Sequence, residues 1–194
     1  MYSEYVKAFI LYAKNKDLPQ TKNLLKSTFQ KDSTRFDIMQ EVGKICYYMR
    51  DYKSASNYYK PFLEIRETYN LDVFRSEDAK IGFVLAEIGQ KEEAEKLFAN
   101  FKKYAENDQS IYKHINLAMY YSLKKKQKLA IEHQRLFSQQ DNYHFWILVF
   151  IEIDPLIYNI KNFPEFEKVF SEIETKFWKK HKQMKTSLET KGLI

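Results

Sequence analysis

Apolar side chains recur every three to four residues along most of the chain, which is the period of an amphipathic α-helix. Tyr5, Phe9 and Tyr12 show this period at the start. A break follows at Asp17, which can cap the next helix, and at Pro19, which fits a first helical turn. Similar breaks recur to residue 142, so the pattern predicts antiparallel pairs of helices of about 12 to 17 residues, joined by short loops.

Consecutive helix pairs repeat one spacing of small and aromatic residues. In the second pair, a small residue is followed after twelve positions by alanine, then after four and three more by aromatic residues: Gly43, Ala55, Tyr59 and Phe62. The third pair has Gly82, Ala94, Phe98 and Phe101 at the same spacing. The fourth has Ala118, Ala130, Gln134 and Phe137, and the first has a degenerate Phe9, Thr21, Leu25 and Thr28. We expect the small residues to mark the closest approach of the paired helices.

These residues resemble the tetratricopeptide repeat, whose period is near 34 residues. Residues 43–59 match it most closely, residues 82–98 come next, and the resemblance covers about residues 2–140. It implies an all-α fold, an α-α superhelix of about four helix pairs with the first degenerate. The chain departs from the family pattern at Cys46 and Leu85, where the family often has tyrosine, and at Pro61, which should disturb its helix.

Residues 141–194 depart from the repeat, and we expect them to form C-terminal helices that cap the array. A short apolar helix is predicted over residues 143–152. A long one, beginning at a capping-box pair of Asn162 and Glu165, is predicted to reach about residue 190. The Asp-Pro-Leu at 154–156 and Pro-Glu-Phe at 164–166 resemble the end of helical repeat regions in large bacterial multidomain regulators. This resemblance implies a scaffold or sensory part of a bacterial, cytoplasmic regulatory protein.

Composition and charge exclude several functional classes. With four glycines and four prolines in 194 residues, the chain lacks both the turns of an all-β fold and a glycine-rich phosphate loop. No apolar run is long enough for a membrane span. The net charge of +6 is spread over the chain and is weak evidence for nucleic acid. The histidines at 114, 133, 144 and 181 lack the spacing of metal ligands on a helix, so we predict no cofactor, no metal and no enzymatic activity.

A protein or peptide partner is the leading functional hypothesis. In the resembled family, the first helix of each pair lines a concave groove, and aromatic and methionine side chains suit peptide binding there. The corresponding positions are Gln40, Lys44, Tyr47, Tyr48, Phe83, Glu87, Tyr112, Ile115 and Met119. The alternative is that the C-terminal helices fold back and fill this groove, which would make its aromatic residues part of the core.

Other interpretations stay open at this stage. The array could mediate self-association without a separate ligand. Lysines around Trp178 could bind nucleic acid, although glutamates interrupt them, so a solvated helix face is favoured. Cys46 is predicted to be a small core residue rather than a reactive thiol. Tyr2, Tyr5 and Phe9 predict an apolar patch on the first helix, which an upstream domain or a second copy would cover.

Overall fold

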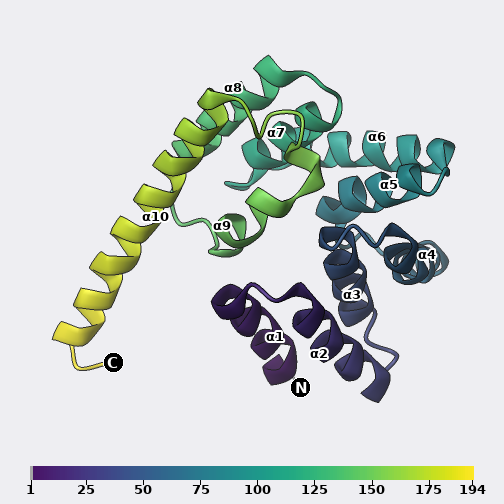
Figure 1. Cartoon of the computed structure of the whole chain (residues 1–194), viewed down its shortest axis with the longest axis horizontal. Helices are drawn as coiled ribbons and strands as arrows, with labels where there is room; N and C mark the ends of the chain where they lie inside the picture. The colour runs from purple at the N-terminus through teal and green to yellow at the C-terminus, as the bar shows by residue number, and fades with distance from the viewer. Residues whose placement is uncertain (1) are drawn as a thin grey trace. The chain divides into compact units, whose positions relative to one another are not determined.

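The computed structural model describes the backbone of residues 2–194 and the side chains of residues 6–194 (Figure 1). Over this range the chain consists of α-helices, short 3-10 turns and loops, with no strand, which confirms the all-α helical-repeat fold. It divides into two compact units, Met1–Tyr104 and Ala105–Ile194. The boundary predicted near residue 140 therefore lies inside the second unit.

The first unit contains successive antiparallel helices. They are α1 (Tyr2–Asn15), α2 (Leu18–Lys31), α3 (Phe36–Tyr48), α4 (Tyr52–Thr68), α5 (Asp78–Glu87) and α6 (Lys91–Asn107), whose last turn belongs to the second unit. A short 3-10 turn, η1 (Arg75–Glu77), precedes α5. Each helix from α1 to α4 packs on the next along the chain, and α3 also contacts α5. The helix α4 continues through Pro61, so this proline does not end it.

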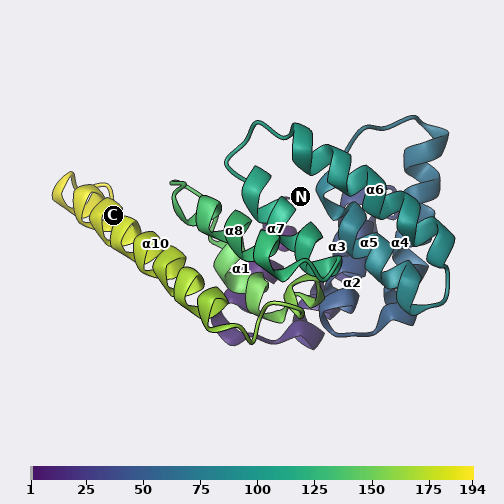
Figure 2. The ribbon, with the colours of Figure 1, turned by 90° about the horizontal axis from the view of Figure 1, so that it is seen from above.

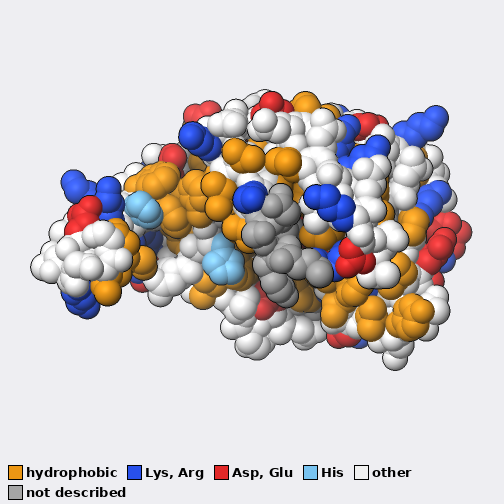
Figure 3. Space-filling model, turned by 90° about the horizontal axis from the view of Figure 1, so that it is seen from below, with side chains coloured by type: hydrophobic (Ala, Val, Ile, Leu, Met, Phe, Trp, Pro, Cys, Tyr) orange, Lys and Arg blue, Asp and Glu red, His pale blue; other side chains and the backbone are white. Residues whose placement is uncertain are grey.

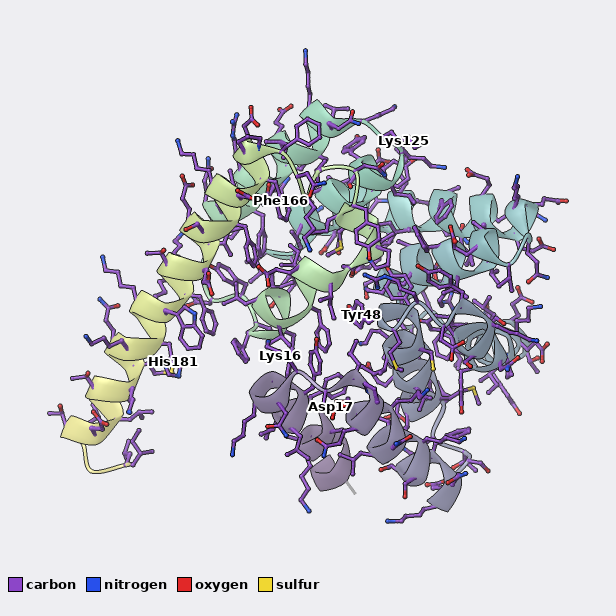
Figure 4. All side chains as sticks on the ribbon, in the orientation of Figure 1. Lys16, Asp17, Tyr48, Lys125, Phe166 and His181 are labelled. Carbon is purple, nitrogen blue, oxygen red and sulfur yellow. The ribbon has the colours of Figure 1, made fainter. Side chains whose placement is uncertain are left out.

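The turn between the two helices of a pair has the same backbone conformation four times. Lys16, Arg50, Gly89 and Lys125 all have a positive φ, and they are separated by 34, 39 and 36 residues (Lys16 and Lys125 are labelled in Figure 4). After three of them the next amide donates back into the helix: Asp51 N to Cys46 O, Gln90 N to Leu85 O and Lys126 N to Tyr121 O, at 2.8 to 3.0 Å. This is the Schellman type of helix ending. The repeat seen in the sequence is therefore a repeat of local structure.

The small residues lie where the paired helices approach most closely. A Cβ atom added to Gly43 would lie 2.9 Å from the Tyr59 ring, and one added to Gly82 would lie 2.7 Å from the Phe98 ring. Ala94, one turn before Phe98, is 1% exposed. Contacts this short are not found between real side chains, so the aromatic rings require glycine opposite them. The predicted role of these residues is confirmed.

The second unit is built around a helix pair and the C-terminal helices. The pair is α7 (Lys113–Leu123) and α8 (Gln127–Ser138), followed by α9 (Trp146–Phe150), the 3-10 turns η2 (Ile151–Ile153) and η3 (Pro155–Ile157), and α10 (Pro164–Thr190). The helix α10 packs on α8, and η3 packs on α7. Ile115, Phe137, Ile157, Phe166 and Ile173 meet in one hydrophobic core.

A lysine joins α10 to the end of α8. The Nζ atom of Lys176 donates to the backbone oxygens of Ser138, Gln139 and Gln140 at 2.8 to 3.1 Å. It also lies 3.2 Å from the Asp141 carboxylate. The last carbonyls of a helix have no partner within the helix, and the positive charge complements the helix dipole. Lys176 therefore fixes the position of α10 along α8.

Helix starts were predicted with mixed success. Asp17 and Asp51 accept hydrogen bonds from the backbone of Gln20 and Ser54, and so cap α2 and α4. The capping box at Asn162 is wrong, because α10 begins at Pro164 after Phe163 and has no side-chain cap. The missing donor of proline leaves one fewer backbone group to satisfy there. The apolar helix predicted over 143–152 is shorter, since it comprises α9 and η2 only.

The apolar patch predicted on the first helix is only partly within the described side chains. Tyr2 and Tyr5 lie outside them. Phe9 is buried, whereas Val6 and Ile10 are 43% and 56% exposed. Within residues 2–194, no helix has both the length and the apolar character that crossing a bilayer requires.

Candidate functional site

The residues predicted to line a groove fall into both units, and the expectation that they are exposed is largely wrong. Four of them are buried: Gln40, Tyr47, Tyr48 and Ile115. Lys44, Phe83, Tyr112 and Met119 are half-buried, and Glu87 is exposed. The predicted set is therefore not one open surface, and each unit has to be considered by itself.

In the second unit, the C-terminal helices cover the predicted positions. Ile115 belongs to the same hydrophobic core as Phe166 and Ile173 of α10, and Tyr112 and Met119 pack against that core. The Tyr112 hydroxyl also accepts a hydrogen bond from the backbone N–H of His144 at 3.0 Å. The residues of α7 that were predicted to line a groove are therefore covered by the C-terminal helices, which is the alternative considered in the sequence analysis.

In the first unit, charged side chains of α3, η1 and α5 meet at a common site. We call Glu41, Lys44, Glu77 and Lys80, together with Gln40, which adjoins Glu41 in the sequence and lies one turn before Lys44, the inner polar cluster. The Nζ atom of Lys44 lies 2.7 Å from Glu41 Oε1 and 3.9 Å from Glu77 Oε1. Lys80 Nζ lies 3.3 Å from Glu77 Oε2. The side chains of these four charged residues are at most 16% exposed, so the cluster is a nearly buried, electrically neutral group of two carboxylates and two lysines.

The hydrogen-bonding capacity of this cluster is only partly used. Gln40 is fully buried, yet neither Oε1 nor Nε2 of its side chain has a hydrogen-bond partner among the described residues. The Oε2 atom of Glu41 is also buried without one. Leaving a buried polar group unpaired costs about 1 to 3 kcal/mol, so native proteins do this rarely. Gln40 and Glu41 are therefore the residues of the cluster whose buried side-chain atoms lack a hydrogen-bond partner among the described residues.

The two carboxylates of the cluster titrate differently. Burial raises the pKa of Glu41, and the nearby Lys44 only partly offsets this effect. Burial also raises the pKa of Glu77, but the charges of Lys80 and Lys44 together outweigh it, so the net shift is downward. Glu77 is therefore the carboxylate that the two lysines hold ionised, and Glu41 is the one that protonates more readily.

A buried ion pair positions the segment that contributes Glu77 and Lys80. Arg66 of α4 donates from Nη1 to Asp78 Oδ1 at 2.6 Å, and the two side chains are 4% and 0% exposed. Burial raises the pKa of Asp78, and the hydrogen bond from Arg66 opposes that shift. Because Asp78 adjoins Glu77 in the sequence, this pair fixes the start of α5 against α4 and with it one side of the cluster.

Aromatic rings lie one to two turns further along the same helices. The Tyr47 ring is 5.9 Å from the Phe83 ring and 5.2 Å from the Tyr48 ring, measured between centroids. Tyr48 is the last residue of α3 (Figure 4). Phe83 is half-buried, so apolar contact area remains beside the polar atoms.

The structure also brings together two histidines that the sequence left apart. His114 of α7 and His133 of α8 have their Nδ1 atoms 3.0 Å apart, and the Tyr121 ring stacks on His133 at 5.3 Å. One ring must donate and the other accept, which requires that at least one Nδ1 carries no proton. Burial lowers the pKa of both imidazoles, and for His133 the charge of His114 lowers it further.

This pair predicts a pH dependence of stability. A histidine whose pKa is lower in the folded state contributes stability above its unfolded pKa, about 6.5, and loses it as the pH falls toward the folded value. We expect the melting temperature to fall between about pH 6.5 and 5, and to fall less in His133→Phe than in the wild type. Thermal melts over this pH range test this, with the exposed His181→Phe as the control. Equal pH slopes in the wild type and His133→Phe would contradict it.

The sequence contained signals for some of the missed residues. His114 lies 11 residues before the turn at Lys125 and His133 lies 8 residues after it, so both are in the part of an antiparallel pair where facing side chains can meet. Glu41 and Lys80 are separated by 39 residues, which is the step between the second and third pairs, so they occupy equivalent positions on α3 and α5. Within each repeat a glutamate lies three residues before a lysine, Glu41 before Lys44 and Glu77 before Lys80, and these two i,i+3 pairs are joined by Lys44 and Glu77 at 3.9 Å.

The structure places Cys46 in the core, as the sequence predicts. Cys46 is 1% exposed, and burial raises the pKa of its thiol to about 11, so it is a core residue with little thiolate at neutral pH. Among residues whose side chains are described, no three histidine, cysteine or acidic residues are grouped as metal ligands.

Searches of protein-family models, curated proteins and solved structures find no match to this chain.

Proposed function

We propose that the first unit binds a peptide segment of a protein partner at the inner polar cluster. The observation that supports this most strongly is the buried side-chain amide of Gln40, neither polar atom of which is hydrogen bonded among the described residues. The resemblance to the tetratricopeptide repeat, and to helical regions of bacterial regulators, supports the same role for the chain as a scaffold or sensory module.

A peptide is the ligand whose chemistry suits this site. A side-chain amide has one acceptor and one donor group close together, as has each main-chain peptide unit. Gln40 could therefore pair with one unit of an extended peptide through two hydrogen bonds. The Oε2 atom of Glu41 would accept a hydrogen bond from the ligand, and Phe83 would contact an apolar side chain of it.

Access of a ligand to the buried Gln40 amide requires that a neighbouring side chain move, and Lys44 is our candidate. This residue lies one helical turn after Gln40 and therefore on the same face of α3. Its side chain is 16% exposed, more than those of Glu41 and Glu77. We propose that the Lys44 side chain rotates away from Glu41 when a ligand reaches Gln40. Binding would then exchange the ion pairs of Lys44 with Glu41 and Glu77 for hydrogen bonds to the ligand.

Selection of displayed random peptides on the purified chain, followed by fluorescence anisotropy of the selected peptides, tests this proposal. We expect Gln40→Met to weaken binding by about tenfold or more, because two buried hydrogen bonds are lost. The control is Gln30→Met, the same change at an exposed position of α2. Selected peptides that bind the wild type and Gln40→Met equally would contradict the proposal. It would also be contradicted if no peptide were selected and the purified chain only associated with itself.

A further inference from the structure

Two imidazole rings meet across the helix pair of the second unit. His114 lies at the start of α7 and His133 lies in the middle of α8, and these helices pack side by side in Figures 1 and 2. The Nδ1 atoms of the two rings are 3.0 Å apart, although the residues are 19 positions apart in the sequence. Spacing along a single helix, on which the expectation of no metal rested, carries no information about a pair of this kind.

Both of these nitrogens can offer a lone pair to a cation. A hydrogen bond between two Nδ1 atoms requires that one of them has no proton, and the other loses its proton when the ring changes to its Nε2 tautomer. The ring centroids are 5.2 Å apart, so the two nitrogens point toward each other, and an ion would bind after the rings turn toward it. Both side chains are half-buried, which leaves them accessible to water.

The separation of the two nitrogens suits neighbouring ligands of one metal ion. Bonds from a metal to histidine nitrogen are about 2.0 to 2.1 Å long, so two bonds that span 3.0 Å make an angle of about 90° to 100° at the metal. This is close to the right angle between neighbouring ligands of a square-planar or octahedral ion, and smaller than the angle of a tetrahedral zinc site. Copper(II) has the square-planar preference and also binds nitrogen ligands most tightly among the divalent ions of its series.

The surroundings of the pair do not exclude a cation. Lys113 and Glu132 are the charged residues that act on His133 together with His114, and their charges are opposite in sign. The Tyr121 ring stacks on His133 with the centroids 5.3 Å apart and supports one face of that imidazole. On the face of the molecule in Figure 3, by contrast, histidine side chains lie apart from one another. A single imidazole supplies one ligand, whereas the pair supplies two.

We propose that His114 and His133 together bind a divalent transition-metal ion, with copper(II) preferred over zinc(II). The Nδ1 atom of each ring supplies one ligand, and water supplies the others, because the described side chains include no group of three ligands. The ion links α7 to α8 and therefore stabilises the folded second unit, since the unfolded chain does not hold the two imidazoles together. This site is separate from the inner polar cluster and does not depend on peptide binding there.

Titration of the metal-free whole chain with copper(II) chloride, followed by electron paramagnetic resonance, tests this site. We expect one tightly bound copper ion per chain, with hyperfine splitting from two imidazole nitrogens. At a free copper concentration about 100 times the Kd, the melting temperature should rise by about 5 °C or more. Zinc(II) chloride at the same concentration should raise it less.

Variants of each histidine separate this pair from other copper ligands. His114→Phe and His133→Phe should each bind copper about tenfold more weakly or worse, and should lose the rise in melting temperature. His181→Phe removes an exposed imidazole of α10 and is the matched control, which should behave as the wild type. Equal copper binding by His133→Phe and the wild type overturns the proposal. So does a wild-type spectrum with fewer than two nitrogen ligands, which decides the matter even if a variant does not fold. A larger rise with zinc than with copper overturns the preference for copper.

Discussion

Replacing Arg66 by methionine is expected to lower the free energy of unfolding of the first unit by about 3 to 5 kcal/mol. Arg66 is the hydrogen-bonded partner of Asp78, whose side chain is fully buried. Methionine fills much of the same volume but leaves the carboxylate without this partner. Burial already raises the pKa of Asp78 against the pull of Arg66, so the carboxyl group should protonate more readily in the variant. The variant should therefore lose less stability at low pH than at neutral pH.

Urea unfolding followed by circular dichroism measures this change. Arg75→Met is the matched control, because Arg75 lies 3.8 Å from the other oxygen of Asp78 and its side chain is 35% exposed. We expect a loss of less than about 1 kcal/mol there. The double variant Arg66→Met with Asp78→Leu should recover much of the stability, since both charges are then absent. A loss in Arg66→Met no larger than in Arg75→Met would contradict the role of this pair.

Replacing Gln40 by methionine is expected to raise the free energy of unfolding by about 1 to 3 kcal/mol. Methionine has a similar length and no amide, so the change removes two buried polar atoms that lack partners among the described residues. The same variant should lose peptide binding. Such a trade-off between stability and binding is typical of functional residues. At Gln40 it would arise because the side-chain amide forms its hydrogen bonds only with the ligand.

Gln134→Met is the control for this effect. Gln134 of α8 is also buried, but its Nε2 atom donates to Phe166 O at 3.2 Å. Gln134 Oε1 is also buried without a partner among the described residues, so this variant removes one unpaired polar atom and one hydrogen bond, where Gln40→Met removes two unpaired atoms and no bond. In thermal and urea unfolding, the free energy of unfolding should therefore rise more in Gln40→Met than in Gln134→Met. Destabilisation of both by the same amount would mean that Gln40 is satisfied in the folded chain.

The structural features that are determined by residues close together in the sequence could be predicted from it. The helix pairs follow from apolar periodicity, the caps at Asp17 and Asp51 from local hydrogen bonding, and the close approach at Gly43 from the missing side chain. Each is determined by a few residues in one or two turns of helix. The failed cap at Asn162 shows the limit of such rules, because Pro164 begins α10 without a side-chain hydrogen bond.

The site was harder to predict because periodicity tells which face a residue occupies and not what covers that face. Gln40 and Lys44 were found from their positions on the first helix of a pair. Glu77 was missed because it lies in the 3-10 turn before α5, outside the helical pattern. The burial of Ile115 depends on Phe166 and Ile173, which are about fifty residues away in the sequence and approach it only in the folded second unit.

The proposed function predicts a specific change at one side chain, which nuclear magnetic resonance can observe. In a proton–nitrogen correlation spectrum, the side-chain amide signals of Gln40 are those that disappear in Gln40→Met. On addition of a selected peptide, we expect these signals to shift downfield and to saturate together with the anisotropy, since the amide then donates a hydrogen bond to the peptide. Saturable peptide binding that leaves the Gln40 side-chain signals unchanged would contradict the proposed site.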